Sequence, residues 1–139
     1  MPARSSLHVP QRFAAYLAAG ERVLGLVAAT RDVGTLDGLS THTGTVILTD
    51  RRLVFAASTP DDGEIGYYPL TAIDRVDGTR SLLGWQISFR HTGSAIRLKW
   101  ITAPAAKSFY RALRDQQKVA IREERKLRIQ TDSPARHVA

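Results

Sequence analysis

The chain lacks cysteine, so neither disulfide cross-links nor cysteine-ligated zinc sites can form. It also lacks a long apolar run, because no stretch approaches the roughly 20 residues that a membrane-spanning helix needs. The N-terminal run FAAYLAAG is short, contains a tyrosine and stops at Glu21-Arg22, unlike the core of a secretory signal. These absences favour a cytoplasmic protein, and the length of 139 residues favours one domain.

Acidic residues are scarce relative to basic ones. The sequence has 13 Asp and Glu against 20 Lys and Arg, which gives a net charge of +7. Between residues 105 and 139 there are nine basic residues and four acidic ones, so most of the excess lies near the C-terminus. Because basic surfaces attract polyanions, this pattern makes nucleic acid and anionic lipid candidate ligands of the tail.

The stretch LTDRRLVFA at 48–56 places two adjacent arginines between two apolar runs. Aliphatic and β-branched residues on both sides are typical of strands, and Asp50 can start a turn through its own side chain. The stretch therefore predicts a hairpin of strands 43–49 and 52–57. Two interpretations of Arg51 and Arg52 stay open: a charged tip in solvent, or a docking point for an anion.

Five further short apolar runs predict strands. They lie at 22–30, 64–70, 73–79, 85–90 and 95–100. The segment 31–42 is rich in glycine and aspartate, so it is predicted to be a loop. In the last strand Ile96, Leu98 and Trp100 alternate with polar residues and should share one face. Strands joined by short turns pair mainly antiparallel, and seven of them should bend into a barrel or two layers.

Helices are predicted at both ends of the strand region. A short amphipathic helix is expected over 10–19, and a long helix should begin near Thr102 and run to about Leu127. Its apolar positions recur near the helical period, so Phe109 and Leu113 should enter the core. Residues 131–139 are polar and are expected to fray.

This order of elements resembles the bacterial PH-like group of pleckstrin-homology and GRAM-like domains. The resemblance covers about residues 20–117 and is carried by GTVILTDRRLVFAAS, YYPLTAIDRVDG, GWQISF and AAKSFYRALRDQ. It implies a mainly β fold, a seven-stranded antiparallel bent sheet or barrel capped by the long C-terminal helix. We therefore divide the chain into an N-terminal segment (1–20), a PH-like domain (21–117) and a basic helix extension with a frayed tail (118–139).

The resemblance also implies a binding module rather than an enzyme, for lipid headgroups, peptides or partner proteins, although a fold does not fix its ligand. Phosphoinositide-binding members carry a basic set around the first two strands. Here the expected first strand ends with Arg31 alone, and Arg51 with Arg52 could substitute in part. The candidate anion site is therefore Arg31, Arg51 and Arg52.

Catalytic, metal and cofactor sites are not predicted. The four histidines lie in predicted loops or near the termini, without partners at ligand spacing: His8, His42, His91 and His137. The acidic cluster of Asp61, Asp62 and Glu64 is typical of a solvated turn. No glycine-rich segment has the spacing and lysine of a phosphate-binding loop.

The long helix is predicted to outrun the domain that it caps, which would leave apolar residues flanked by basic ones. The candidate interface consists of Arg114, Lys118, Val119, Ile121, Arg122, Arg125 and Leu127. It could meet a partner protein or a second copy of the chain. The alternative is peripheral binding to anionic lipid at the inner face of a membrane. Nucleic acid ranks below both, because alternation points most strand aromatics inward.

Overall fold

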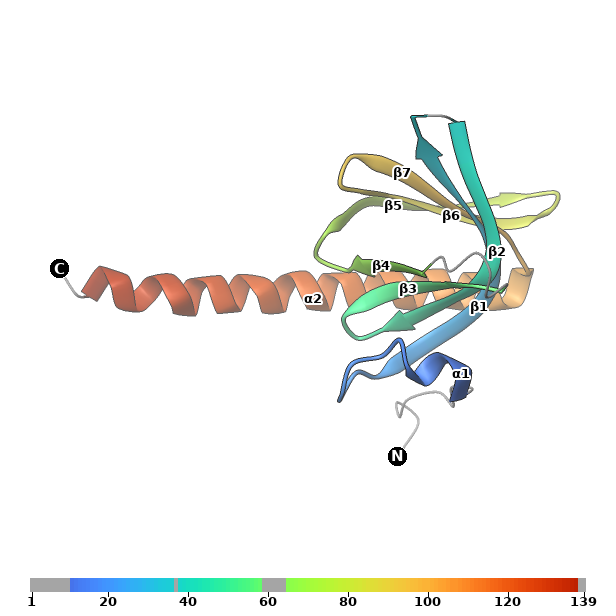
Figure 1. The fold of residues 1–139 in the computed structure, drawn as a ribbon. Coiled ribbons are helices and arrows are strands. Elements are labelled where there is room, and N and C mark those ends of the chain that lie inside the picture. The colour runs from blue at the N-terminus through green and yellow to red at the C-terminus, as the bar shows by residue number, and fades with distance from the viewer. Residues whose placement is uncertain (1–10, 37, 59–64, 138–139) are drawn as a thin grey trace.

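The computed structural model describes residues 11–36, 38–58 and 65–137, in one helical turn, seven strands and one long helix (Figure 1). In chain order the elements are α1 (Gln11–Ala14), β1 (Val23–Thr35), β2 (Gly38–Thr49), β3 (Arg52–Ala57), β4 (Ile65–Pro69), β5 (Ile73–Ser81), β6 (Gly84–His91), β7 (Ser94–Ile101) and α2 (Ala103–His137). Within these described residues, no helix is long and apolar enough to cross a membrane.

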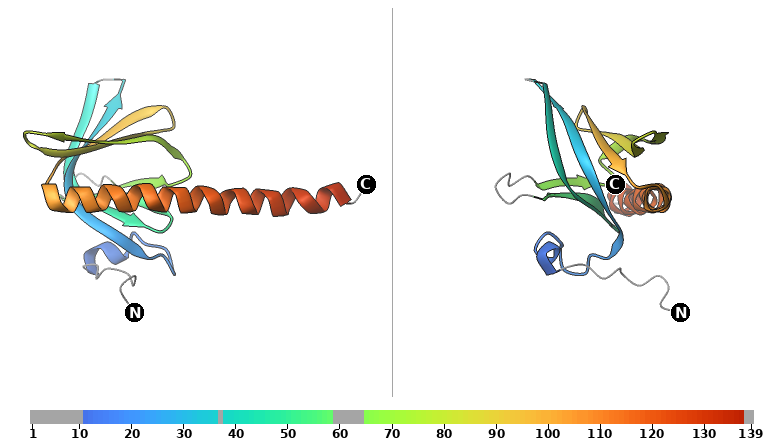
Figure 2. Two further views of the ribbon diagram at one scale, coloured as in Figure 1. Left: turned by 180° about the vertical axis from the view of Figure 1, so that it is seen from behind. Right: turned by 90° about the vertical axis from the view of Figure 1, so that its right-hand side faces the viewer.

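The seven strands form one antiparallel sheet in the order β4-β3-β2-β1-β7-β6-β5. The long β1 holds it together, because it pairs with β2 along almost all of its length and with β7 at residues 30–33. The sheet curls, and α2 lies along its open side (Figure 2). The predicted seven-stranded antiparallel bent sheet with a C-terminal helix is confirmed.

The core lies between the concave face of the sheet and the first half of α2. The inward strand residues Phe55, Ile87 and Phe89 are almost fully buried, as are Phe109 and Leu113 of α2. The prediction that these two helix residues enter the core is therefore confirmed. Gln116 and Gln117 extend the attachment by donating hydrogen bonds to main-chain carbonyls beside the sheet.

The prediction of a loop over 31–42 is wrong. β1 continues to Thr35 and β2 begins at Gly38, with a regular register from Arg31↔His42 to Thr35↔Gly38. Aspartate is a poor strand former, but Asp32 is only 4% exposed here and has two partners. Its carboxylate lies 2.9 Å from Lys99 Nζ and accepts a 2.8 Å hydrogen bond from Thr41, so cross-strand contacts overrule composition.

Trp100 also departs from its predicted place beside Ile96 and Leu98. Its side chain is 50% exposed, because its backbone adopts a positive φ of 63°. The register between β6 and β7 shifts between Trp85 and Ile87, and Ile101, 1% exposed, takes the inward position instead. The left-handed backbone at Trp100 thus shifts the inward and outward alternation of side chains in β7 by one residue.

Both helices differ in length from prediction. The N-terminal one is a single turn, α1, much shorter than the expected span of 10–19; Phe13 packs there against Ile47 and Val54 on the outer face of the sheet. The C-terminal one continues to His137, so the expectation of fraying is wrong for 131–137. The second half of α2 projects well beyond the sheet (Figure 1).

Candidate functional site

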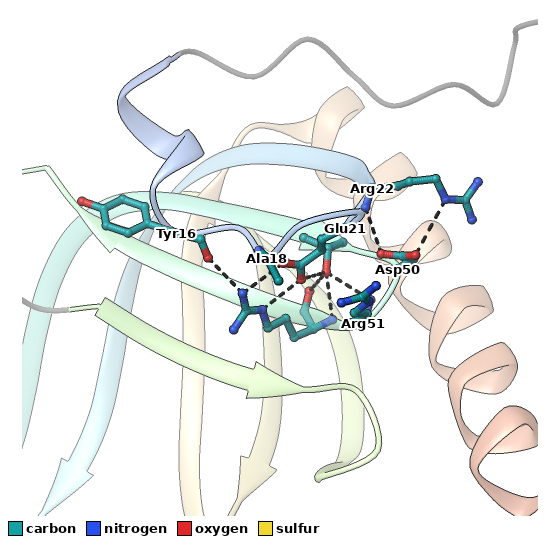
Figure 3. Close-up of polar contacts among 8 residues, drawn as sticks. Tyr16, Ala18, Glu21, Arg22, Asp50 and Arg51 are labelled. Carbon is teal, nitrogen blue, oxygen red and sulfur yellow. Dashed lines mark hydrogen bonds and ion pairs between the residues drawn. The ribbon is translucent and has the colours of Figure 1, made fainter. Parts of the chain in front are cut away.

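The Arg51-Arg52 turn is tied to the segment before β1 (Figure 3). Arg52 donates hydrogen bonds of 2.9 and 3.0 Å to the two carboxylate oxygens of Glu21, and one of 2.9 Å to the carbonyl of Tyr16. Thr49 donates a further 2.6 Å bond to Glu21, whose side chain is fully buried. We call this set, Tyr16, Glu21, Thr49 and Arg52, the Arg52 clasp.

The clasp is ionised on both sides. Burial raises the pKa of Glu21, but hydrogen bonds from Arg52 and Thr49 outweigh it and leave the pKa below its ordinary value. The hydrogen bond with Glu21 raises the pKa of Arg52. Arg52 is therefore occupied by the fold, whereas the side chain of Arg51 is exposed and makes no ion pair within the described part of the chain.

Arg31 lies away from the Arg51-Arg52 turn, and its side chain packs inside the domain. Its side chain is 4% exposed on the concave face, where one guanidinium nitrogen donates a 2.9 Å hydrogen bond to the hydroxyl of Tyr68. The guanidinium also lies 4.4 Å from the centre of the Phe55 ring. Arg31 is eight residues along β1 from the end beside the Arg51-Arg52 turn, about 26 Å in an extended strand. The structure therefore does not bring the three arginines of the candidate anion site together.

A second candidate site lies between α2 and the strands β5 and β6. It is a hollow of about 410 Å³ lined by Gly78, Trp85, Lys107, Tyr110, Arg111, Arg114, Asp115 and Lys118. An adjoining hollow of about 340 Å³ shares Arg114 and Lys118 and is completed by Arg75, Val76, Gln117 and Ile121. We call the two hollows together the basic groove.

The floor of the basic groove is aromatic and fixed in place. Tyr110 packs so closely on Gly78 that a Cβ atom there would lie 3.0 Å from the ring. Arg114 donates a 2.9 Å hydrogen bond to the hydroxyl of Tyr110 and a longer one, 3.4 Å, to the carbonyl of Val76. Glycine in β5 thus allows an aromatic floor to form under the cations.

The cations of the groove belong to a longer series on α2. Residues spaced three or four apart lie on one face of a helix, and this basic face consists of Lys107, Arg111, Arg114, Lys118, Arg122 and Arg125. Two acids of the same helix pair with cations outside this face: Glu123 with Lys126, and Glu124 with Arg128 at 2.7 Å. Among the described side chains, which on α2 end at Gln130, no ion pair neutralises a cation of the basic face.

The predicted interface residues therefore fall into two groups. Arg114, Lys118 and Ile121 line the basic groove. The others, Val119, Arg122, Arg125 and Leu127, are exposed on or near the projecting half of α2.

Sequence reasoning missed most of the groove lining, including Trp85, Tyr110 and Lys107. Lys107 could have been found, since it continues the spacing of the basic residues by one turn. The aromatic floor had no such signal, because it depends on how α2 packs against β5 and β6.

Metal binding has no support in the described residues, where no three histidine and carboxylate side chains gather. His91 packs edge-on against Tyr68, with ring centres 5.1 Å apart, and thus forms part of the domain wall. The acidic cluster of Asp61, Asp62 and Glu64 lies outside the described residues.

Comparison with solved structures shows similarity to PH domains. The N-terminal PH domain of Vps36 is 13% identical, with a TM-score of 0.58 over 73% of this chain and 83% of that one. The PH domain of USP37 is 11% identical, with a TM-score of 0.52 over 67% and 96%. The C-terminal domain of an unknown protein from Leishmania infantum is 17% identical, with a TM-score of 0.58 over 76% and 90%. No curated protein matches the chain.

The family comparison agrees with the fold. Residues 17–115 match the model described as bacterial PH domain, which spans all seven strands and the packed half of α2. Domains of this fold are generally non-catalytic modules that bind proteins or lipids. The narrower GRAM-like resemblance stays a prediction. The chain belongs to the bacterial PH domain family.

Proposed function

We propose that this PH domain is a non-catalytic module that binds a partner protein, or a second copy of itself, through α2. Residues 21–117 supply the folded body, and 118–139 supply much of the contact surface. The observation that carries the proposal is the projecting half of α2, which leaves the sheet after Ala120 (Figure 1). No strand of the sheet lies beside this half of α2 in the left view of Figure 2.

A projecting helix has little to stabilise it within its own chain. Residues 122–137 would extend for about 24 Å at the rise of an α-helix. Two exposed ion pairs along the helix, Glu123–Lys126 and Glu124–Arg128, are each worth about 0.3–0.5 kcal/mol. Most helix stability in proteins comes from tertiary packing, and Val119 and Leu127 expose 43% and 63% of their surface. A partner that covers these residues would supply the missing packing.

The test uses the full-length chain with Val119→Asp and Leu127→Asp together. Capture from native cell extract after nuclease treatment, and sedimentation velocity of the purified chain, report a partner and self-association respectively. The charge-matched control is Arg80→Gln with Arg97→Gln, at two exposed strand positions outside α2. We expect the first pair to abolish the association and the control to keep it. An association that survives the first pair would refute this role for the projecting helix.

Peripheral binding to anionic membrane is the second candidate, favoured by the unpaired basic face of α2. Each basic residue near a negatively charged bilayer contributes about 1 kcal/mol. Arg51 would add a separate contact, because its exposed side chain lies on another part of the surface. Arg31 and Arg52 would contribute less, since both guanidinium groups already have partners within the domain.

Vesicle sedimentation distinguishes this candidate. Vesicles containing phosphatidylserine should retain the wild-type chain at low salt, and neutral vesicles should not. Arg122→Gln with Arg125→Gln should weaken retention, and Arg51→Glu should weaken it independently. Equal retention on neutral and anionic vesicles would exclude an electrostatic membrane role.

A further inference from the structure

The basic groove combines features that the projecting half of α2 does not explain. Its walls hold five cations, Arg75, Lys107, Arg111, Arg114 and Lys118, against one lining carboxylate, Asp115. Among these cations, only Arg114 has a hydrogen bond or ion pair with another described residue. Leaving cations unpaired around an aromatic floor favours an anionic occupant, because attraction is stronger where solvent is partly excluded.

An apolar element lies beside this groove. Leu82 and Leu83 form the β5–β6 turn, and their side chains are 105% and 72% exposed. The turn lies on the same side of the domain as the start of α2, although the two are separated in the views of Figures 1 and 2. Trp85, at the start of β6, connects the turn to the groove lining. Two exposed leucines at a turn are unusual on a soluble surface and indicate a contact site.

The shape of the site selects among anions. The cations from Lys107 to Lys118 spread along about 16 Å of helix rather than converging on one point, as a compact phosphate headgroup would require. The lining carboxylate of Asp115 would repel a uniformly charged nucleic-acid backbone. A flat membrane surface would not reach the half-buried Tyr110 at the floor. A linear chain of mixed acidic and apolar residues meets all three conditions.

We propose that the basic groove binds an acidic segment of a partner protein that carries an aromatic side chain. The aromatic ring would pack against Trp85 and Tyr110, and its carboxylates would pair with Lys107, Arg111 and Lys118. Leu82 and Leu83 would cover an apolar residue at one end. This proposal rests on the proposed function as a protein-binding module, and it places a second contact on the packed half of α2.

The test measures fluorescence anisotropy of a labelled synthetic peptide in which glutamates flank a single tyrosine. A peptide with glutamine in place of every glutamate is the matched ligand control. The groove variant is Arg111→Gln with Lys118→Gln, and the charge-matched control variant is Arg122→Gln with Arg125→Gln. All are measured on the full-length chain, and circular dichroism verifies that each variant is folded.

We expect the acidic peptide to bind and the glutamine peptide to bind at least about tenfold more weakly. The groove variant should lose about tenfold in affinity, as expected for two exposed charge pairs, while the control variant loses less than about threefold. Equal losses in both variants, or no binding of the acidic peptide, would overturn the proposal. Loss of phosphatidylserine vesicle binding in the groove variant, without peptide binding, would assign the groove to membrane instead.

The outcome is separable from that of the proposed function. Val119→Asp with Leu127→Asp alters the projecting helix and leaves the groove lining intact. This variant should bind the acidic peptide like the wild type, even where it loses its partner. The groove proposal and the projecting-helix proposal can therefore each fail alone.

Discussion

Replacing Arg52 with alanine should destabilise the protein far more than the same change at Arg51, although the two residues are adjacent. Arg52 makes three hydrogen bonds, two of them to the fully buried carboxylate of Glu21. Removing it leaves that carboxylate with Thr49 and the main-chain N–H of Ala18 as its donors. The exposed Arg51 side chain has no comparable partner among the described residues.

The magnitude follows from the burial of the two partners. Breaking a fully buried ion pair costs about 3–5 kcal/mol, because the remaining charge stays desolvated. The Arg52 side chain is 25% exposed, so water can partly replace it, and the lower end of that range, about 3 kcal/mol, is expected. For a domain of this size that corresponds to a melting temperature lower by about 10 °C. Arg51→Ala should change the free energy of unfolding by less than about 0.5 kcal/mol.

Thermal and urea unfolding followed by circular dichroism would measure both variants. Glu21→Gln, Arg52→Ala and the double variant form a double-mutant cycle. The double variant should lose less free energy of unfolding than the sum of the losses in the two single variants. Equal melting temperatures for Arg51→Ala and Arg52→Ala would refute the assignment of Arg52 to the clasp.

Lowering the pH should reduce the difference in the free energy of unfolding between the wild type and Arg52→Ala. The pKa of Glu21 is lowered in the folded state, so its contribution is complete above the ordinary value of 4.5. That contribution is lost as the pH falls below 4.5 through the folded-state pKa. The stability gap should therefore be largest near neutral pH and narrow progressively in acid. A gap that is constant with pH would show that Arg52 acts through packing alone.

Two backbone predictions follow from glycine and turn geometry. Gly44→Ala should lower the free energy of unfolding by about 3 kcal/mol, because the added Cβ would overlap the carbonyl oxygen of Ala56. Gly34→Ala, where a Cβ meets nothing within 4 Å, is the control and should change it by less than about 0.5 kcal/mol. Thr92→Asn should raise it by about 0.5 kcal/mol, since Thr92 and Gly93 have φ of 49° and 82° in a two-residue turn that favours Asn-Gly. Denaturant titration measures all three, and an unchanged Gly44→Ala would contradict the packing described here.

Local patterns identified most of the fold. The hairpin of β2 and β3 was predictable from two apolar runs around Asp50, and the irregular spacing of Ile73 and Val76 corresponds to a bulge at Arg75, with φ of 53°. The helical period placed Phe109 and Leu113 in the core. In each case the information lies within a few residues, where period and turn chemistry operate.

Features set by partners distant in sequence were not predictable. Asp32 lies in a strand because Lys99 and Thr41 satisfy its carboxylate, and Trp100 leaves its face because one backbone angle is left-handed. The Arg52 clasp joins Glu21 and Arg52, which are 31 positions apart, and no local pattern around Arg52 predicts this pairing. The groove similarly depends on helix packing, which only the tertiary structure supplies.

The positive charges must therefore be separated into those with partners inside the domain and those open to a ligand before the net charge supports a functional argument. Arg31 and Arg52 carry two of the positive charges, yet the first bonds to Tyr68 inside the sheet and the second neutralises a buried carboxylate. These cations satisfy internal partners and have little left to attract a ligand. The cations of the basic face have no acidic partner among the described side chains, so together they create a continuous positive field along α2. The attraction implied by the composition is consequently concentrated on α2, and the tests of function belong there rather than at the arginine pair that stands out in the sequence.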